Sequence, residues 1–153
     1  MKKKLGKVNK PQVVLLTSGQ PSLNPRLIKE ADVLFHSGYK VTVLYQYWNE
    51  WGTRLDAEIF SSKKWNFIRV GGSPTKETFT YWFTKIKHKS CILIARTFGF
   101  KYGLAELSIG RCTSSLYKEA KKHSADLYIA HNLAALPAAI KAAKKKNVKC
   151  GFD

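Results

Sequence analysis

The chain has 153 residues, which is the length of one ordinary domain that can bury a core of its own. With 44% hydrophobic and 24% charged residues it is too apolar to be intrinsically disordered, and no apolar run approaches the roughly 18–20 residues of a membrane-spanning helix. The 27 lysines and arginines outnumber the 10 acidic residues, and this net charge of +17 favours an anionic partner: a phosphorylated ligand, acidic lipid headgroups, nucleic acid or an acidic protein.

Part of this charge needs no partner. Lys144, Lys145 and Lys146 lie at the end of a predicted helix, where cations suit the negative end of the helix dipole. Scattered lysines of this kind also keep a protein surface solvated, so both interpretations of the net charge stay open.

The N-terminus and the cysteines indicate the compartment. Residues 1–10, MKKKLGKVNK, form a basic lead that we expect to be flexible, and it runs into a strand rather than into the apolar core of a signal peptide. Cys91, Cys112 and Cys150 are widely spaced and form no CxxC pair. We interpret them as buried thiols in a reducing compartment, with neither zinc nor disulfides implied.

The first folding unit spans residues 12–45 and predicts a strand, a loop, a helix and a second strand. Residues 12–17 are a continuous apolar run, as is typical of a parallel strand covered on both faces. Asn24-Pro25 predicts an N-cap followed by proline at the first helical position, and Gly38 stands where a left-handed C-cap belongs. Residues 40–45 form the second strand, so the unit is a βαβ crossover.

The loop of this unit, TSGQPSLNPR, follows a strand at the edge where open α/β sheets bind ligands. A glycine there lets backbone N–H groups approach a ligand, and a helix N-terminus beside it suits a phosphate or a sugar hydroxyl. The GxGxxG and GxxxxGK[ST] patterns are absent, which disfavours a dinucleotide or ATP cradle. The alternative is a plain turn before a capped helix. The candidate ligand-binding residues are Ser18, Gly19, Gln20 and Asn24.

Arg26 is the second residue of the predicted helix, where a cation opposes the helix dipole. This conflict suggests a specific anionic partner, such as the phosphate of a donor or an acceptor. The alternative is an ion pair with Glu30, one helical turn further on. After the second strand, Tyr47, Trp48 and Trp51 can either stack on sugar rings or anchor a loop.

The middle of the chain is basic and aromatic. Residues 66–70 predict a short strand, and residues 76–123 predict two helices broken near Gly99 or Gly103. Between residues 65 and 104 there are seven cations and one acidic residue, interleaved with aromatics. Basic amphipathic helices with interfacial aromatics lie on anionic membrane surfaces. Alternatively the aromatics pack into the core; nucleic acid is disfavoured because no recognised binding module appears. The membrane-facing candidates are Trp82, Phe83, Lys85, Lys87 and Lys89.

A second unit closes the chain. Residues 126–130 predict a strand, residues 133–146 an alanine-rich helix and residues 148–152 a further strand. His131 and Asn132 lie at the tip of the first of these strands. Histidine there can hydrogen-bond a sugar hydroxyl or stabilise developing charge. The alternative is a histidine satisfied by a neighbouring carbonyl, with Asn132 as an N-cap.

Two segments carry a resemblance to a known family: SGQPSLNPRLIKEADVLFHSGYKVTVLY near the start and ADLYIAHNLAALPAAIKAAKKKNVKCGFD at the end. Together they resemble the N-terminal, acceptor-side domain of family 4 (group 1) GT-B glycosyltransferases. The resemblance implies a Rossmann-like three-layer α/β fold with a mostly parallel sheet, over residues 11–153. It also implies that a second, donor-binding domain with an E-x7-E motif follows Asp153, which agrees with a chain that stops on a predicted strand.

The same resemblance implies an activity. It is the retaining transfer of a sugar from a nucleotide-activated donor to a saccharide or lipid-linked acceptor, in envelope polysaccharide synthesis on the cytoplasmic side of the membrane. No cofactor or essential metal is implied beyond the nucleotide-sugar co-substrate. His131 would be the catalytic residue, facing the donor sugar, with Asn132 and Arg26 among the binding residues. The rival hypotheses are a single-domain Rossmann-like module that binds a small anionic ligand without catalysis, and a basic domain that docks on membranes or nucleic acid.

Overall fold

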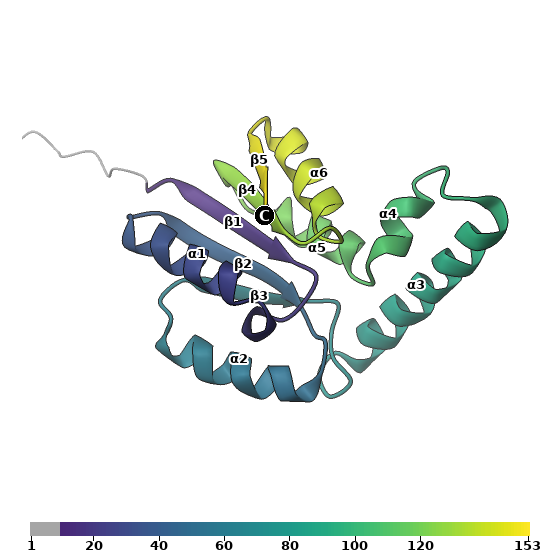
Figure 1. The fold of residues 1–153 in the computed structure, drawn as a ribbon, viewed down its shortest axis with the longest axis horizontal. Helices are drawn as coiled ribbons and strands as arrows, with labels where there is room; N and C mark the ends of the chain where they lie inside the picture. Colours follow the sequence, from purple (N-terminus) through teal and green to yellow (C-terminus); the bar gives the residue numbers. More distant parts are fainter. Residues whose placement is uncertain (1–9) are drawn as a thin grey trace, which may run out of the picture.

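Five strands form one all-parallel sheet in the order β3-β2-β1-β4-β5 (Figure 1). The computed structural model describes residues 10–153, so the predicted basic lead lies, apart from Lys10, outside the described residues. The strands are β1 (Gln12–Thr17), β2 (Lys40–Gln46), β3 (Asn66–Val70), β4 (Leu127–His131) and β5 (Lys149–Phe152). The α-helices are α1 (Pro25–His36), α2 (Glu50–Ser62), α3 (Thr78–Phe98), α4 (Leu104–Ile109), α5 (Thr113–Ala120) and α6 (Leu136–Lys146), and a 3-10 turn, η1 (Pro21–Leu23), precedes α1.

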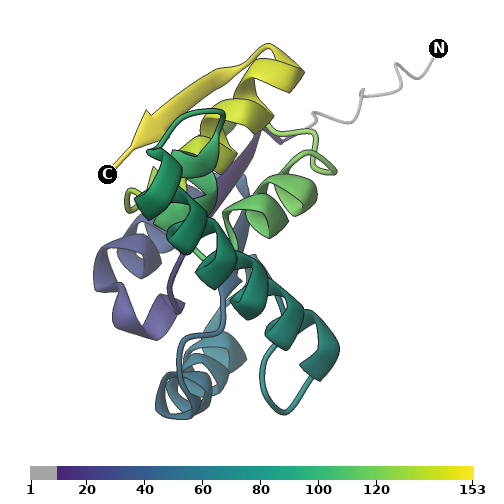
Figure 2. The ribbon, with the colours of Figure 1, turned by 90° about the vertical axis from the view of Figure 1, so that its right-hand side faces the viewer.

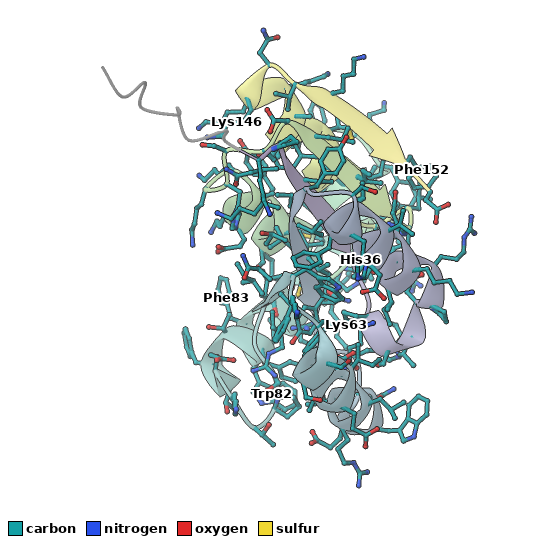
Figure 3. The ribbon with its side chains drawn as sticks, turned by 90° about the vertical axis from the view of Figure 1, so that its left-hand side faces the viewer. His36, Lys63, Trp82, Phe83, Lys146 and Phe152 are labelled. Atoms are coloured by element: carbon teal, nitrogen blue, oxygen red, sulfur yellow. The ribbon has the colours of Figure 1, made fainter. Side chains whose placement is uncertain are left out.

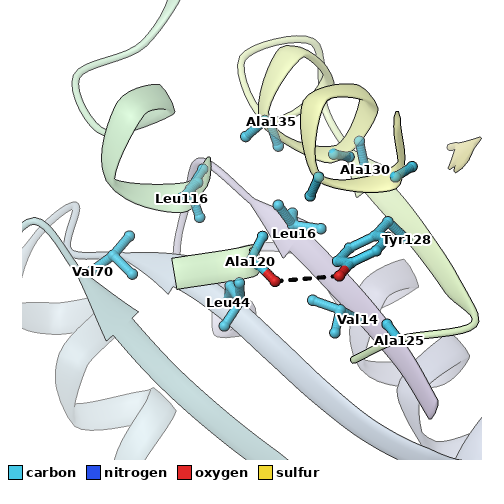
Figure 4. Close-up of a cluster of buried hydrophobic side chains, with 14 of the residues drawn as sticks. Val14, Leu16, Leu44, Val70, Leu116, Ala120, Ala125, Tyr128, Ala130 and Ala135 are labelled. Carbon is cyan, nitrogen blue, oxygen red and sulfur yellow. Dashed lines mark hydrogen bonds between the residues drawn. The ribbon is translucent and has the colours of Figure 1, made fainter. Parts of the chain in front are cut away.

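Both faces of the sheet are covered, which explains the continuous apolar run of β1. Val13 and Leu15 face the layer that contains α1, whereas Val14 and Leu16 face α5 and α6. The second of these layers is drawn in Figure 4, where the Tyr128 hydroxyl donates to the backbone carbonyl of Ala120 at 3.3 Å. The predicted Rossmann-like α/β class with a parallel sheet is confirmed.

The predicted βαβ unit is also confirmed. The Asn24 side chain accepts a hydrogen bond from the backbone N–H of Leu27 at 3.2 Å, and Pro25 is the first residue of α1. Gly38 follows the helix at φ +91°, a left-handed conformation that favours glycine.

The middle of the chain differs from the prediction in two respects. Helix α2 was not predicted, and residues 76–123 contain three helices instead of two. The first break lies at Gly99–Gly103, as predicted. The second lies at Gly110, where a Cβ atom would stand 2.8 Å from the Cβ of Ala134. A side chain there would prevent the close approach of the α4–α5 junction to the β4–α6 loop.

Helices α3 and α4 stand beyond the carboxyl ends of the strands and outside the two layers (Figures 1 and 2). Helix α3 packs mainly on α4. Trp82 and Phe83 of α3 lie in the lower part of the view in Figure 3, away from Lys146 and Phe152 near its top. Among residues 10–153, no helix combines the length and the apolar character needed to cross a membrane.

The cysteines only partly match the prediction of buried thiols. Cys91 and Cys112 are buried, but Cys150 lies on the edge strand β5 and is exposed. Burial raises the pKa of the Cys112 thiol to about 11, against the opposing effect of the Arg111 charge.

Candidate functional site

The carboxyl edge of the sheet has a topological switch point between β1 and β4. From β1 the chain builds β2 and β3 on one side, and it then crosses to build β4 and β5 on the other. The loops after β1 and β4 therefore diverge, and open α/β sheets bind ligands in the crevice that this leaves. Ser18 and Asn132, both predicted to contact a ligand, follow these two strands directly.

Ser18 and Asn132 join the two strand tips. The Ser18 hydroxyl donates to Oδ1 of Asn132 at 2.8 Å, and Nδ2 of Asn132 donates to the Thr17 hydroxyl at 3.0 Å. Oδ1 also accepts from the backbone N–H of Ala135 at 3.2 Å, so Asn132 stabilises the turn before α6. The N-cap of that helix is Ala135, and not Asn132 as the alternative interpretation proposed. Its backbone has φ +103°, which is unusual for a residue other than glycine. The strand tips are thus fixed by side-chain contacts.

A pocket of about 410 Å³ opens beside this junction, between the tips of β1 and β2 and helix α3. An adjoining hollow of about 450 Å³, which includes Gly19 and Asn132, shares Ser18, Trp48, Ile109 and Ala134 with it. We call the two together the edge cleft. Its walls are aromatic and cationic, and no Asp or Glu is among the lining residues. The first pocket is lined by Ser18, Gln46, Tyr47, Trp48, Tyr81, Lys85, His88, Lys89, Ile109, Gly110, Arg111 and Ala134.

Two side chains of the edge cleft offer hydrogen-bond acceptors. Gln46 ends β2 with only 3% of its surface exposed, and its Oε1 atom has no hydrogen-bond partner. Nδ1 of His88 lies 3.2 Å from the carbonyl oxygen of Leu107, which can only accept, so Nδ1 is the protonated nitrogen. In the neutral ring, Nε2 is therefore an acceptor. Buried polar atoms are rarely left unpaired, so Oε1 of Gln46 is an acceptor whose hydrogen-bonding capacity the described residues do not use.

Arg111 fixes the wall of the edge cleft. Its guanidinium donates to the carbonyl of Gly71 and the hydroxyl of Thr84, both at 2.8 Å, and to the carbonyl of Tyr47 at 3.2 Å. It also lies over the Tyr81 ring, 4.8 Å from the centroid. Burial, and secondarily the nearby Glu50 carboxylate, raises the pKa of the Tyr47 phenol, which therefore stays protonated. The cleft thus has a rigid, positively charged wall.

Two of the predicted binding residues have structural roles. The buried Gln20 amide donates to Thr53 and Asp56, at 3.1 and 3.0 Å, and accepts from the backbone N–H groups that precede α2. Its hydrogen-bonding capacity is used within the protein. Asn24 caps α1. We therefore do not include either side chain in the edge cleft.

His131 was expected to face the cleft; the structure instead turns its ring toward α1. The ring is 1% exposed, and Nε2 lies 2.5 Å from a carboxylate oxygen of Glu30. Its Nδ1 lies 3.3 Å from Asp153, whose carboxylate also pairs with Arg26 at 2.6 Å. Arg26 thus contacts Asp153 rather than the suggested Glu30. A catalytic role for His131 stays a prediction that these contacts do not test.

The membrane-facing candidates all lie on α3. Trp82 and Phe83 are exposed, and the ammonium group of Lys85 lies over the Trp82 ring, 4.8 Å from the centroid. Lys85 and Lys89 also line the edge cleft. Lys87 lines a different pocket, which lies between α3, α4, α5 and α6. The cleft and the exposed side of α3 are therefore neighbours.

Sequence reasoning missed Gln46, Tyr81, His88 and Arg111 as residues of the site. The first ends a strand that was predicted, so its place at the carboxyl edge could have been found. The other three come from the region where the helices were not divided correctly, and no local pattern shows that they face β2. Among residues 10–153, no three His, Cys, Asp or Glu side chains are grouped to hold a metal ion.

Comparisons with known proteins establish the fold. No protein-family model and no curated protein sequence matches the chain. The structure is similar to the C-terminal domain of the PF1911 hydrogenase from Pyrococcus furiosus, with a TM-score of 0.52 and 11% identity over 95% of this chain and 92% of that one. It is also similar to the glycosyltransferase VinC in complex with dTDP, with a TM-score of 0.50 and 15% identity.

The match to VinC covers 91% of this chain but only 33% of VinC. At such low identities the two likenesses show a shared Rossmann-like fold, which matches one half of a GT-B glycosyltransferase. They do not establish an activity, because one of the two proteins is named as a hydrogenase and the other as a glycosyltransferase.

Proposed function

We propose that this chain is the acceptor-side half of a retaining GT-B glycosyltransferase. The observation that carries the proposal is the edge cleft at the switch point, where the unpartnered Oε1 of Gln46 lies among aromatic rings. A sugar hydroxyl would supply the missing donor, and Tyr47, Trp48 and Tyr81 would pack on sugar rings. Lys85 and Lys89 would bind a phosphate on the same acceptor.

The donor would be a nucleotide-activated sugar, and the dTDP bound to VinC supports a nucleoside diphosphate as the carrier. A second domain outside these 153 residues would hold it. The acceptor hydroxyl oxygen would bond to the anomeric carbon of the donor while the bond from that carbon to the diphosphate breaks. The hydroxyl proton would pass to the departing diphosphate. This chain would orient the acceptor through Ser18, Gly19, Asn132 and Gln46.

The reading frame beyond Asp153 tests the enzyme assignment. A second Rossmann-like domain with an E-x7-E motif would support the proposal. A stop codon directly after Asp153 would overturn it and would favour the rival hypothesis, a single-domain module that binds a small anionic ligand.

Ligand binding to the chain itself tests the edge cleft. We expect N-acetylglucosamine 1-phosphate to shift the backbone NMR signals of Ser18 and Tyr47, and the substitution Gln46→Leu to weaken this binding roughly fivefold, the effect of one hydrogen bond. Gln12→Leu is the matched control, because it makes the same change at the amino end of the same sheet. Equal binding of inorganic phosphate and the sugar phosphate, unaffected by Gln46→Leu, would favour the anionic-ligand module instead.

A further inference from the structure

Helix α3 has two apolar faces, of which only one is covered. Thr84, Cys91 and Ala95 are buried against the rest of the molecule. The opposite face carries residues at the spacing i, i+3, i+4 and i+7, which places them in one stripe along the helix. We call this the α3 stripe; it consists of Phe79, Trp82, Phe83, Ile86, Leu93 and Ile94, all exposed.

The α3 stripe is large for a surface without a partner. Phe79 is 83% exposed, Phe83 58% and Leu93 67%, and beyond the helix Phe100 and Tyr102 are exposed as well. Phe79 and Phe83 stack on each other with centroids 6.3 Å apart, so the aromatics form a continuous surface. Contiguous exposed apolar patches mark interaction sites, because scattered single residues are the rule elsewhere on soluble proteins.

The charges around the stripe identify its partner. Between residues 78 and 102 there are five cations and no carboxylate. Lys87 lies on one side of the stripe, and Lys85, Lys89 and Arg96 lie on the other, as the helical spacing requires. Glu77, the acidic residue just before the helix, is already paired with Arg69 at 3.0 Å. An apolar stripe bordered by cations on both sides matches a surface that has apolar depth and negative headgroups.

We infer that α3 docks on an anionic lipid bilayer, with the α3 stripe in the interfacial region and the flanking lysines on the headgroups. Trp82 suits this place because its ring is apolar and its N–H is polar. Lys85 and Lys89 also line the edge cleft, so docking would bring the cleft to the membrane surface. The inference does not depend on glycosyl transfer, since the stripe and its charges would dock a binding module equally well.

The test is co-sedimentation of the 153-residue chain with vesicles of phosphatidylcholine alone and with vesicles that contain about one third phosphatidylglycerol. We expect binding to the anionic vesicles only. The variant F79S/F83S removes apolar surface, and K87E/K89E reverses two flanking charges. Each should weaken binding by at least about tenfold, given what each apolar side chain and each interfacial cation contributes.

Matched controls separate docking from general charge attraction. Val33→Ser replaces an apolar side chain on α1, outside the stripe. Val33 is 64% exposed, which is similar to the 58% of Phe83. K144E/K145E reverses the same number of charges on α6. Both should bind vesicles as the parent chain does, and the N-terminal lysines are constant throughout.

Three results would overturn the inference. They are equal binding to both kinds of vesicle, a loss of binding in the α6 variant as large as in K87E/K89E, and concentration-dependent dimers that F79S/F83S abolishes while vesicles bind nothing. The last would make a second copy of the chain the occupant of the stripe. Circular dichroism melting of every variant ensures that lost binding is not lost folding.

Discussion

Helices α3 and α6 are both basic and amphipathic, but they place their apolar residues differently. Helix α6 buries Ala138, Ala139, Ala142 and Ala143 and turns its lysines to solvent. Helix α3 buries three residues and leaves the large side chains of the α3 stripe exposed. The lysines of the two helices therefore differ in their surroundings. Those of α6 lie on a helix whose apolar face is already buried, whereas those of α3 border an exposed apolar surface.

The positions of the lysines within each helix agree with this difference. Lys144, Lys145 and Lys146 lie in the last turn of α6, where they suit the helix dipole and need no ligand. The lysines of α3 lie in its middle, where the dipole has little effect. The position along the helix thus distinguishes the two groups: the lysines of α6 interact with the helix end and with solvent, and those of α3 are available for an anionic partner.

The largest effect is expected from a charge on the buried face of α6. Ala142 is fully buried in the cluster beneath α6, so Ala142→Asp would place a carboxylate without a partner in the core. We expect the free energy of unfolding, measured by urea denaturation, to fall by about 3–5 kcal/mol. A loss below 1 kcal/mol would mean that α6 is not a fixed layer of the core.

A smaller loss is expected within the same layer from Tyr128→Phe. The Tyr128 hydroxyl donates to the carbonyl of His123 at 2.8 Å and to that of Ala120 at 3.3 Å. Removing it takes the donor from the His123 carbonyl, whereas the Ala120 carbonyl still accepts from the backbone N–H of His123 at 3.1 Å. The free energy of unfolding should therefore fall by about 1 kcal/mol in the same denaturation experiment. An unchanged midpoint would show that water replaces the hydroxyl.

The α6 layer was largely predictable from the sequence, and the region around α3 was not. The strands of both βαβ units are apolar runs bounded by an N-cap, glycine or proline, and such local signals place them within one or two residues of their observed bounds. Helix α2 has an N-cap, Asn49, which accepts from the backbone N–H of Gly52 at 2.6 Å, but it has no buried apolar face that would show a helical period. Of its 13 residues only Gly52 and Asp56 are buried, and its first turn is fixed by Gln20, which lies 30 residues earlier and contacts the two residues before the helix.

The candidate site divides in the same way. Ser18 and Asn132 follow strands whose ends could be read from the sequence, so their meeting at one edge of the sheet could be predicted. The environments of Gln46 and His88 depend on where α3 and α4 pack, which local periodicity does not determine. The orientation of His131 toward Glu30 depends on which face of β4 it occupies, and a strand covered on both faces gives no alternation to decide that.

Substitutions in the α3 stripe should leave stability nearly unchanged, in contrast to those in α6. Phe83 is 58% exposed, so Phe83→Ser should shift the free energy of unfolding by less than about 0.5 kcal/mol while it weakens vesicle binding. Urea denaturation and vesicle co-sedimentation on one preparation measure both. A loss of 2 kcal/mol or more would show that the stripe packs within the folded chain and would remove the basis for docking.

The smallest difference between α3 and the α6 layer can be measured in the chain without substitutions, from the order in which its cysteine thiols react. Cys150 is exposed and should be labelled first at pH 8. Cys91 is buried on the packed face of α3, which rests mainly on the short helix α4, whereas Cys112 lies in the core cluster beneath α5 and α6. Local opening should therefore expose Cys91 at lower urea concentrations than Cys112.

The raised pKa of Cys112, about 11, also slows its labelling in the folded state. At pH 8 its thiol is almost fully protonated, and the thiolate is the reactive form. Mass spectrometry of peptides labelled at increasing urea concentrations measures the order. If Cys91 and Cys112 became reactive together, at the global unfolding transition, α3 would belong to the same cooperative unit as α6. The exposed stripe would then be a rigid part of the domain surface rather than the face of a separately opening element.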